Sequence, residues 1–247
     1  MREDSVWFHA GLPERGVSFR QLFLEAEIVK NGNRTKTIAM SGLLAAVAYV
    51  VMFLSKQIPV SVLGFLNFDL KDAVICIAGF LFGPLSAAGI TLVVSVAEMV
   101  TVSSTGLWGL LMNVLSTCAF VCPAAFLYQR RRTMKNAVAG LILGALLMTV
   151  TMILWNYLIT PIYMKTPREK VVELLIPVFL PFNLIKAGIN GTLTMLLYKP
   201  VVRALRKARL VPESGAGNGG KKFGAAIVAA VLLITFAVLA LVLAGII

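Results

Sequence analysis

The chain alternates long apolar runs with short polar stretches. Four of the runs lie at about residues 37–55, 106–127, 137–158 and 174–198. Each is close to the roughly 20 residues that an α-helix needs to cross the hydrocarbon core of a bilayer. The pattern therefore predicts membrane-spanning helices, and a further run at residues 223–247 predicts one more.

Another apolar stretch, residues 73–97, contains the pair Gly83-Pro84 near its middle. Glycine and proline together break a helix, so we expect two short helices, at about residues 72–82 and 85–102. Two helices, unlike one, put every basic cluster on the same side of the membrane, as the positive-inside rule requires. The N-terminus is then expected in the cytoplasm. The basic clusters are Lys30, Arg34 and Lys36; Arg130, Arg131, Arg132 and Lys135; and Lys199, Arg203, Arg206, Lys207, Arg209, Lys221 and Lys222.

The composition excludes a water-soluble globule. Of the 247 residues, 59% are apolar and 14% are charged, and the mean hydropathy is +0.89, whereas a soluble domain is roughly half apolar and about a quarter charged. The net charge of +12 comes from lysines and arginines at the ends of the apolar runs. Anionic lipid headgroups, and not nucleic acid, are therefore the expected partner of these charges, and the cell membrane is the expected location.

Together these elements predict an all-α, polytopic membrane protein with a six-helix bundle and one extra C-terminal transmembrane helix. We expect a cytoplasmic N-terminal segment at residues 1–36 and the membrane domain at residues 37–199. A basic, glycine-rich cytoplasmic linker at residues 200–222 then leads to the extra helix at residues 223–247.

Polar residues inside the predicted helices fall into stripes. In the run 174–198, four polar residues are spaced three or four positions apart, so they share one face of a helix. Three more helices carry a similar stripe, which predicts a shared polar cavity. Alternatively, the stripes are interhelical hydrogen bonds worth about 0.6 kcal/mol each, which we favour for serine and threonine. The stripes are Asn183, Lys186, Asn190 and Thr194; Thr149, Asn156 and Thr160; Asn113, Ser116 and Thr117; and Thr91, Ser95 and Glu98.

Lys186 stands apart because it lies near the middle of its predicted span. A charged side chain at that depth costs at least about 2.5 kcal/mol, so it needs a carboxylate, backbone carbonyls or a ligand. Glu98 either pairs with Lys186 or reaches water. Asn156 and Asn183 lie on the outer halves of their helices, where an amide offers both a donor and an acceptor to the edge of a planar heterocycle. The aromatic residues around that end either stack on such a ring or form an ordinary interfacial belt.

Five segments carry a family resemblance. They are FLNFDLKDAV (65–74), AGFLFGPLSA (78–87), NxLxxxxFVxPAAFLYQRR (113–131), MTVTMILWNYLITPIY (148–163) and LPFNLIKAGIN (180–190). In this order and spacing, residues 37–199 resemble the substrate-binding S component of energy-coupling factor (ECF) transporters, specifically the riboflavin-specific type. LPFNLIK, together with the preceding Asn156-Tyr157 pair, is the most specific part of the resemblance.

The resemblance implies a six-helix subunit that captures riboflavin from outside the cell and does not itself hydrolyse ATP. It implies a transmembrane coupling protein and two ATPase subunits as partners, with riboflavin as the transported ligand and no cofactor. In the family, the first helix docks on the coupling protein through small residues spaced by four, although any close helix contact requires such spacing. The corresponding residues here are Ser41, Gly42, Ala45, Ala46 and Ala48.

The resemblance also assigns ligand contacts. Asn156, Asn183 and Lys186 resemble the family's polar contacts to the isoalloxazine ring. The loop after the first helix resembles a lid over the pocket, and the polar stripes and the outer aromatic residues complete the predicted site. The additional site residues are Leu63, Gly64, Asn67, Phe68, Asn113, Tyr163 and Asn190.

Other functions remain open at this point. The scaffold also suits an S component for another vitamin, such as a pterin, a pyrimidine or pantothenate. A stand-alone secondary vitamin transporter needs an ion-coupling carboxylate in the membrane, for which Glu98 is the candidate. A membrane enzyme is disfavoured because the single histidine, His9, lies in the polar N-terminal segment and no catalytic or metal-binding motif accompanies it.

Overall fold

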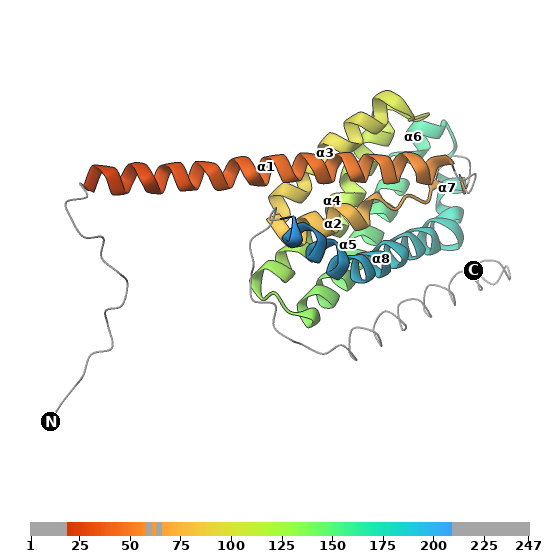
Figure 1. The fold of residues 1–247 in the computed structure, drawn as a ribbon. Helices are drawn as coiled ribbons and strands as arrows, with labels where there is room; N and C mark the ends of the chain where they lie inside the picture. Colours follow the sequence, from red (N-terminus) through yellow and green to blue (C-terminus); the bar gives the residue numbers. More distant parts are fainter. Residues whose placement is uncertain (1–18, 58–60, 63–65, 209–247) are drawn as a thin grey trace. The chain divides into compact units, whose positions relative to one another are not determined.

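The computed structural model describes residues 19–57, 61–62 and 66–208, which are almost entirely helical (Figure 1). Contacts divide the chain after Ala39 into two units. In the first unit, residues 19–39 form the N-terminal part of a helix that continues to Gln57, and the bundle described below belongs to the second unit. In chain order the elements are α1 (Phe19–Gln57), β1 (Ser61–Val62), β2 (Leu66–Asn67), α2 (Lys71–Phe82), α3 (Pro84–Thr101), α4 (Gly106–Arg130), α5 (Met134–Leu158), α6 (Thr160–Met164), α7 (Arg168–Leu174), the π-helical turn η1 (Leu175–Phe179) and α8 (Leu180–Lys207).

The break between α2 and α3 agrees with the sequence prediction. Gly83 adopts φ of +95°, a conformation that side chains with a Cβ rarely take, and Pro84 follows as the first residue of α3. The amide of Gly83 still bonds to the carbonyl of Gly79 at 2.8 Å, which closes α2 tightly. One apolar stretch therefore makes two helices that can point in different directions.

Five helical segments of the described chain are long and apolar enough to cross a membrane. With 12 residues, α2 is about 18 Å long at 1.5 Å per residue, too short to cross alone. Leucine and valine side chains dominate the exposed large hydrophobic residues of the bundle, as a lipid-facing surface requires. The protein is therefore a multi-pass membrane protein. The five segments are Thr35–Gln57, Pro84–Thr101, Gly106–Arg130, Met134–Leu158 and Arg168–Lys207.

Helices α4 and α5 pack against each other along most of their length, next to α2 and α3 (Figure 1). Two glycines of α5 allow this approach. A Cβ on Gly140 would lie 2.9 Å from the carbonyl oxygen of Ala124, and a Cβ on Gly144 would meet the carbonyl oxygen of Phe120. Because these obstacles are backbone atoms, the backbones of α4 and α5 can approach this closely only where α5 has no side chain.

A two-residue antiparallel pair, β1 with β2, follows α1, with Ser61 opposite Asn67 and Val62 opposite Leu66. It returns the chain toward the start of α2, so that Leu66 and Asn67 lie over the interior of the bundle. Leu66 is 2% exposed and belongs to a small apolar cluster with Phe179 and Phe182.

Some helix ends differ from the predicted spans. Helix α1 begins at Phe19, but its apolar part, Thr35–Gln57, agrees with the predicted first span at residues 37–55. The predicted linker begins within α8, which continues through residues 200–207. The span predicted at residues 174–198 contains the π-helical turn η1, and the short helix α6 was not predicted. The predicted extra helix at residues 223–247 lies outside the described residues.

The small residues predicted for partner docking do not all face outward. Ala45 is 7% exposed and Ala48 is fully buried, and both pack in the main apolar core. Gly42 and Ala46 are exposed, and Ser41 is partly exposed. Within the described bundle, Gly42, Ala46 and part of Ser41 therefore lie on the surface, while docking through the five residues stays a prediction.

Candidate ligand-binding site

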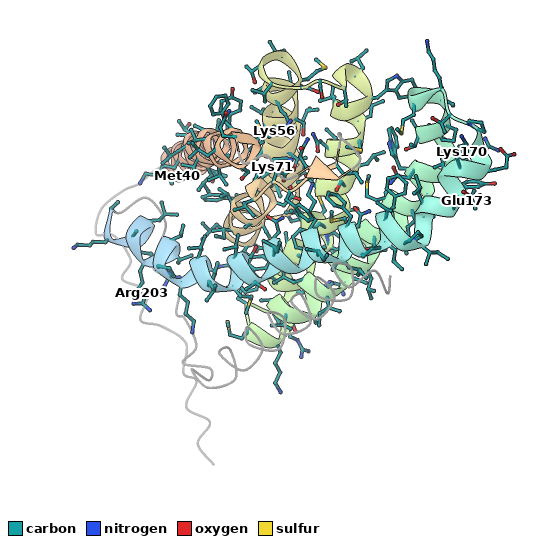
Figure 2. All side chains as sticks on the ribbon, turned by 90° about the vertical axis from the view of Figure 1, so that its right-hand side faces the viewer. Met40, Lys56, Lys71, Lys170, Glu173 and Arg203 are labelled. Atoms are coloured by element: carbon teal, nitrogen blue, oxygen red, sulfur yellow. The ribbon has the colours of Figure 1, made fainter. Side chains whose placement is uncertain are left out.

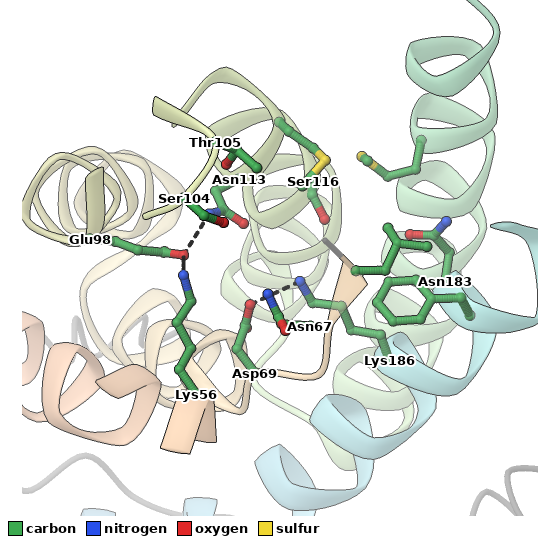
Figure 3. Close-up of a pocket in the computed structure, with 14 residues that line it drawn as sticks. Lys56, Asn67, Asp69, Glu98, Ser104, Thr105, Asn113, Ser116, Asn183 and Lys186 are labelled. Carbon is green, nitrogen blue, oxygen red and sulfur yellow. Dashed lines mark hydrogen bonds and ion pairs between the residues drawn. The ribbon is translucent and has the colours of Figure 1, made fainter. Parts of the chain in front are cut away.

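A pocket opens inside the bundle between residues of α1, β2, α3, α4, α5 and α8 (Figure 3). The space between its lining atoms is about 540 Å³, and part of this space is open solvent. Apolar and polar side chains share the lining. The lining residues are Lys56, Leu66, Asn67, Asp69, Glu98, Ser104, Thr105, Met112, Asn113, Ser116, Met152, Phe182, Asn183 and Lys186.

Lys186 finds its carboxylate in the loop before α2. Its ammonium donates to Asp69 Oδ2 at 3.1 Å and lies 4.0 Å from Asp72 Oδ2. The ammonium of Lys71 donates to the same oxygen of Asp69 at 2.8 Å. The need for a partner inferred from the depth of Lys186 is therefore met by Asp69, a residue that the sequence analysis did not assign to the site.

Glu98 has other partners. Its Oε1 atom lies 2.6 Å from the ammonium of Lys56 and accepts a 2.9 Å hydrogen bond from the amide of Asn113. Its Oε2 atom lies 3.7 Å from the ammonium of Lys71. The open question about Glu98 is thus answered, since the structure pairs it with Lys56 and Lys71 and not with Lys186.

Among the described residues, the ion pairs at the pocket join three lysines, Lys56, Lys71 and Lys186, with three carboxylates, Asp69, Asp72 and Glu98. In Figure 2, Lys56 and Lys71 lie within the bundle, while Lys170 and Glu173 lie at its outer edge. Burial raises the pKa of the loop residue Asp69, but the ammonium groups of Lys186 and Lys71 outweigh burial and hold that pKa well below its usual range. Counted as formal charges, the three lysines and three carboxylates balance one another.

Asn190 fixes the loop that carries Asp69. Its Oδ1 atom accepts a 3.0 Å hydrogen bond from the amide of Ala73, in the first turn of α2. Its Nδ2 atom donates to the carbonyls of Asp69 and Lys186, at 2.9 and 3.0 Å. These bonds satisfy an amide that the start of a helix leaves unpaired. Asn190 is absent from the pocket lining, and its hydrogen bonds anchor the loop. The ligand contact predicted for it from the sequence stays a prediction.

An Asn190→Ala variant is therefore expected to lose stability and not ligand contacts. Removing the amide leaves buried backbone groups unpaired, at a cost of about 2 kcal/mol. The thermal unfolding midpoint in detergent should fall by several degrees. Asn136→Ala is the control, because it removes only one 3.2 Å hydrogen bond, to the carbonyl of Leu127, and should change the midpoint little. A weaker ligand affinity at unchanged stability would contradict the anchoring role and favour the sequence prediction.

The helix that carries Asn183 and Lys186 begins irregularly. Two prolines, Pro177 and Pro181, lack backbone N–H groups, and the π-helical turn η1 lies where they interrupt the regular hydrogen bonding. Asn183 donates to the carbonyl of Phe179 at 2.7 Å, on its own helix. The side chain of Asn183 is buried and lines the pocket. Besides this bond it carries an acceptor, Oδ1, and a second N–H donor.

The structure brings together four of the ten predicted contacts, since Asn67, Asn113, Asn183 and Lys186 all line the pocket. Phe68 packs on Phe182, with ring centroids 4.7 Å apart, and is absent from the lining. Leu63 and Gly64 lie outside the described residues, as does the side chain of Tyr163.

Asn156 is fully buried but does not line the pocket. Its amide donates to the carbonyl of Met152 at 2.7 Å, and its Oδ1 accepts from the hydroxyl of Thr160 at 2.8 Å. Thr160 lines a second, smaller hollow beside Trp108 and Trp155, which shares Thr105 and Met112 with the main pocket. Asn156 therefore lies behind the residues that line the main pocket.

The sequence analysis missed Lys56 and Asp69 as pocket residues. Lys56 lies just beyond the predicted first span, and Asp69 lies in a loop, where helical spacing gives no signal. Counting charges would have indicated that Lys186 needs a carboxylate and would have narrowed the candidates to the few carboxylates in this part of the chain, Asp69 among them.

The fold and the pocket define a multi-pass membrane protein with a small-molecule site inside its helical bundle. Residues 36–198 match the family described as ECF transporter, substrate-specific component, and the chain belongs to this family. Its members are transport subunits and not enzymes, which excludes the membrane-enzyme alternative.

The chain is 27% identical over 203 residues to the riboflavin transporter RibU of Streptococcus thermophilus, covering 78% of this chain and 96% of that protein. It is 26% identical over 189 residues to the riboflavin transporter FmnP of Bacillus subtilis, covering 72% and 99%. A solved structure of the S component of a bacterial ECF transporter superposes with a TM-score of 0.59 at 27% identity, covering 70% of this chain and 99% of that one.

Proposed function

We propose that this chain is the riboflavin-binding S component of an ECF transporter. It binds the vitamin from outside the cell and delivers it with a transmembrane coupling protein and two ATPase subunits. The observation that carries the proposal is the pocket, whose lining combines the apolar side chains of Leu66, Met152 and Phe182 with the amide of Asn183. Relatives named as riboflavin transporters support the choice of vitamin.

The chemistry of riboflavin suits such a pocket. Its isoalloxazine ring is flat and largely apolar, with a polar edge that both donates and accepts hydrogen bonds, and its ribityl chain carries several hydroxyl groups. The apolar side chains of the lining suit the ring faces, and the amides of Asn67 and Asn183 offer donors and acceptors to its edge. The charged and hydroxyl-bearing residues of the lining suit the ribityl chain.

The proposed orientation puts the N-terminus in the cytoplasm. The basic residues at the end of α4 and at the end of α8 would then face the cytoplasm, as the positive-inside rule requires. The exposed face of Gly42 and Ala46 on α1 is the proposed contact with the coupling protein, since small residues let another helix approach closely. The proposed linker to the extra helix begins after the end of α8 at Lys207.

Full-length protein purified in detergent from cells grown in rich medium should carry a flavin absorbance spectrum, at close to one equivalent of flavin per chain. One equivalent is expected because the pocket residues of one chain form one site. If the protein is purified without ligand, added riboflavin should quench its tryptophan fluorescence, because Trp108 and Trp155 line the adjoining hollow.

A Lys170→Met variant, changed at the exposed outer rim, serves as a control and should retain the flavin. A colourless protein whose tryptophan fluorescence does not respond to riboflavin would overturn the assignment of the vitamin. The same titration with a pterin, a pyrimidine or pantothenate would then identify the ligand class.

A further inference from the structure

The pocket has two chemically different ends (Figure 3). At one end lie Asn183 and Lys186 of α8, close to the apolar residues Met152 and Phe182. At the other end Glu98 of α3 lies beside Lys56, with the polar side chains of Ser104, Thr105 and Asn113 around it. A ligand with a flat ring and a polyol chain would match these ends if its ring lay against α8 and its chain pointed toward Glu98.

Glu98 has one carboxylate oxygen that makes no hydrogen bond within the described residues. Its Oε1 atom is engaged by Lys56 and Asn113. Its Oε2 atom is buried and lies 3.7 Å from the ammonium of Lys71, too far for a hydrogen bond. The whole residue is only 2% exposed. Lys71 balances the charge of this oxygen but leaves its hydrogen bond unmade, and the hydroxyl groups of a bound polyol are donors of the right kind.

Charge also distinguishes possible ligands. The three lysines and three carboxylates at the pocket balance one another, so a neutral ligand leaves the network balanced. A phosphate monoester would bring about −1.5 to −2 charges into this enclosed space. At the polyol end it would also face the carboxylate of Glu98.

We propose that Glu98 is the specificity-determining residue of the site: it accepts hydrogen bonds from the ribityl hydroxyls and selects riboflavin over its phosphate ester, flavin mononucleotide. This assignment rests on the proposed function. Lys56 and Asn113 hold the carboxylate in place, and repulsion between like charges disfavours the phosphorylated ligand.

The test compares the dissociation constants of riboflavin and flavin mononucleotide, measured by flavin fluorescence on full-length, ligand-free protein in detergent. The natural chain should prefer riboflavin by at least about tenfold. Glu98→Gln should weaken riboflavin binding and strengthen the binding of the phosphate ester, which lowers the preference on the order of tenfold. Lys56→Met, which removes a neighbouring positive charge, should move the preference in the opposite direction. Glu173→Gln, at the exposed outer edge, should leave both constants unchanged.

The ratio of the two constants separates selectivity from stability, since a loosened fold weakens both ligands equally. If the Glu98→Gln protein still binds riboflavin and the ratio is unchanged, the role assigned to Glu98 is overturned, while the proposed function stands. Should that variant not fold, an unchanged ratio in Lys56→Met would overturn it. Failure of the natural chain to bind either flavin would overturn the proposed function itself.

Discussion

A Lys186→Met variant is expected to bind riboflavin at least about tenfold more weakly than the natural chain. The ammonium of Lys186 uses one hydrogen bond within the described residues, to Asp69, and it lines the pocket, so further N–H donors remain for the ligand. A hydrogen bond to a charged group contributes about 1.5 kcal/mol or more, and methionine keeps the length of the side chain without the donors. Titration of riboflavin against tryptophan fluorescence measures the loss.

A matched control lies on the same helix. Lys199→Met removes an exposed lysine of α8 and should leave the affinity for riboflavin unchanged. A folded Lys186→Met protein that binds riboflavin as tightly as the natural chain would show that Lys186 does not contact the ligand. A loss of expression alone would point to a structural role.

The double variant Lys186→Met with Asp69→Asn separates the two roles. Removing Lys186 alone leaves three carboxylates facing two lysines, and an uncompensated buried charge is strongly destabilising. The second substitution restores the balance, with Lys56 and Lys71 facing Asp72 and Glu98. Stability should therefore recover in the double variant, while the affinity for riboflavin should stay low.

Hydropathy was enough to predict the membrane bundle and the break at Gly83-Pro84, because the length of an apolar run and the conformation of glycine are local properties. It was not enough to find the ends of the helices. Backbone hydrogen bonds extend α1 and α8 beyond their apolar runs into polar sequence, where hydropathy carries no information. Two prolines, Pro177 and Pro181, mark the irregular segment at the start of α8. The other residues of this segment are mostly apolar, so hydropathy alone does not distinguish it from an ordinary span.

Helical spacing correctly predicted that the polar stripes face inward. Asn183, Lys186, Asn190 and Thr194 are all buried, as are most members of the other stripes. Spacing could not distinguish an amide that faces the pocket from one that closes on its own helix or anchors a loop. Asn156 and Asn190 carry the same chemistry as Asn183, but neither lines the pocket.

The charge network shows a second reason why the sequence alone could not define the site. Lys186 and Asp69 are 117 residues apart, and Asp69 lies in a loop without periodic spacing. The cost of a charge in the membrane predicts that a partner exists but not which of several carboxylates it is. Only the packing of α8 against the start of α2, held by Asn190, decides between them.

A Gly144→Ala variant is expected to destabilise the bundle, although alanine is normally the better helix former by about 1 kcal/mol. The new Cβ would meet the carbonyl oxygen of Phe120, so α4 and α5 would have to move apart. Overpacking of this kind costs roughly 1–3 kcal/mol, and a backbone obstacle places the cost at the upper end. The thermal unfolding midpoint in detergent should fall by several degrees.

Gly89→Ala provides the matched control, because a Cβ at Gly89, on the exposed side of α3, meets nothing within 4 Å. There the helix preference of alanine acts alone, and the midpoint should stay constant or rise. The two substitutions are chemically identical, so opposite signs isolate the close contact between α4 and α5. Equal stability of both variants would show that these helices can separate without cost. The pocket would then not depend on this contact, although Asn113 and Met152 reach it from the two helices.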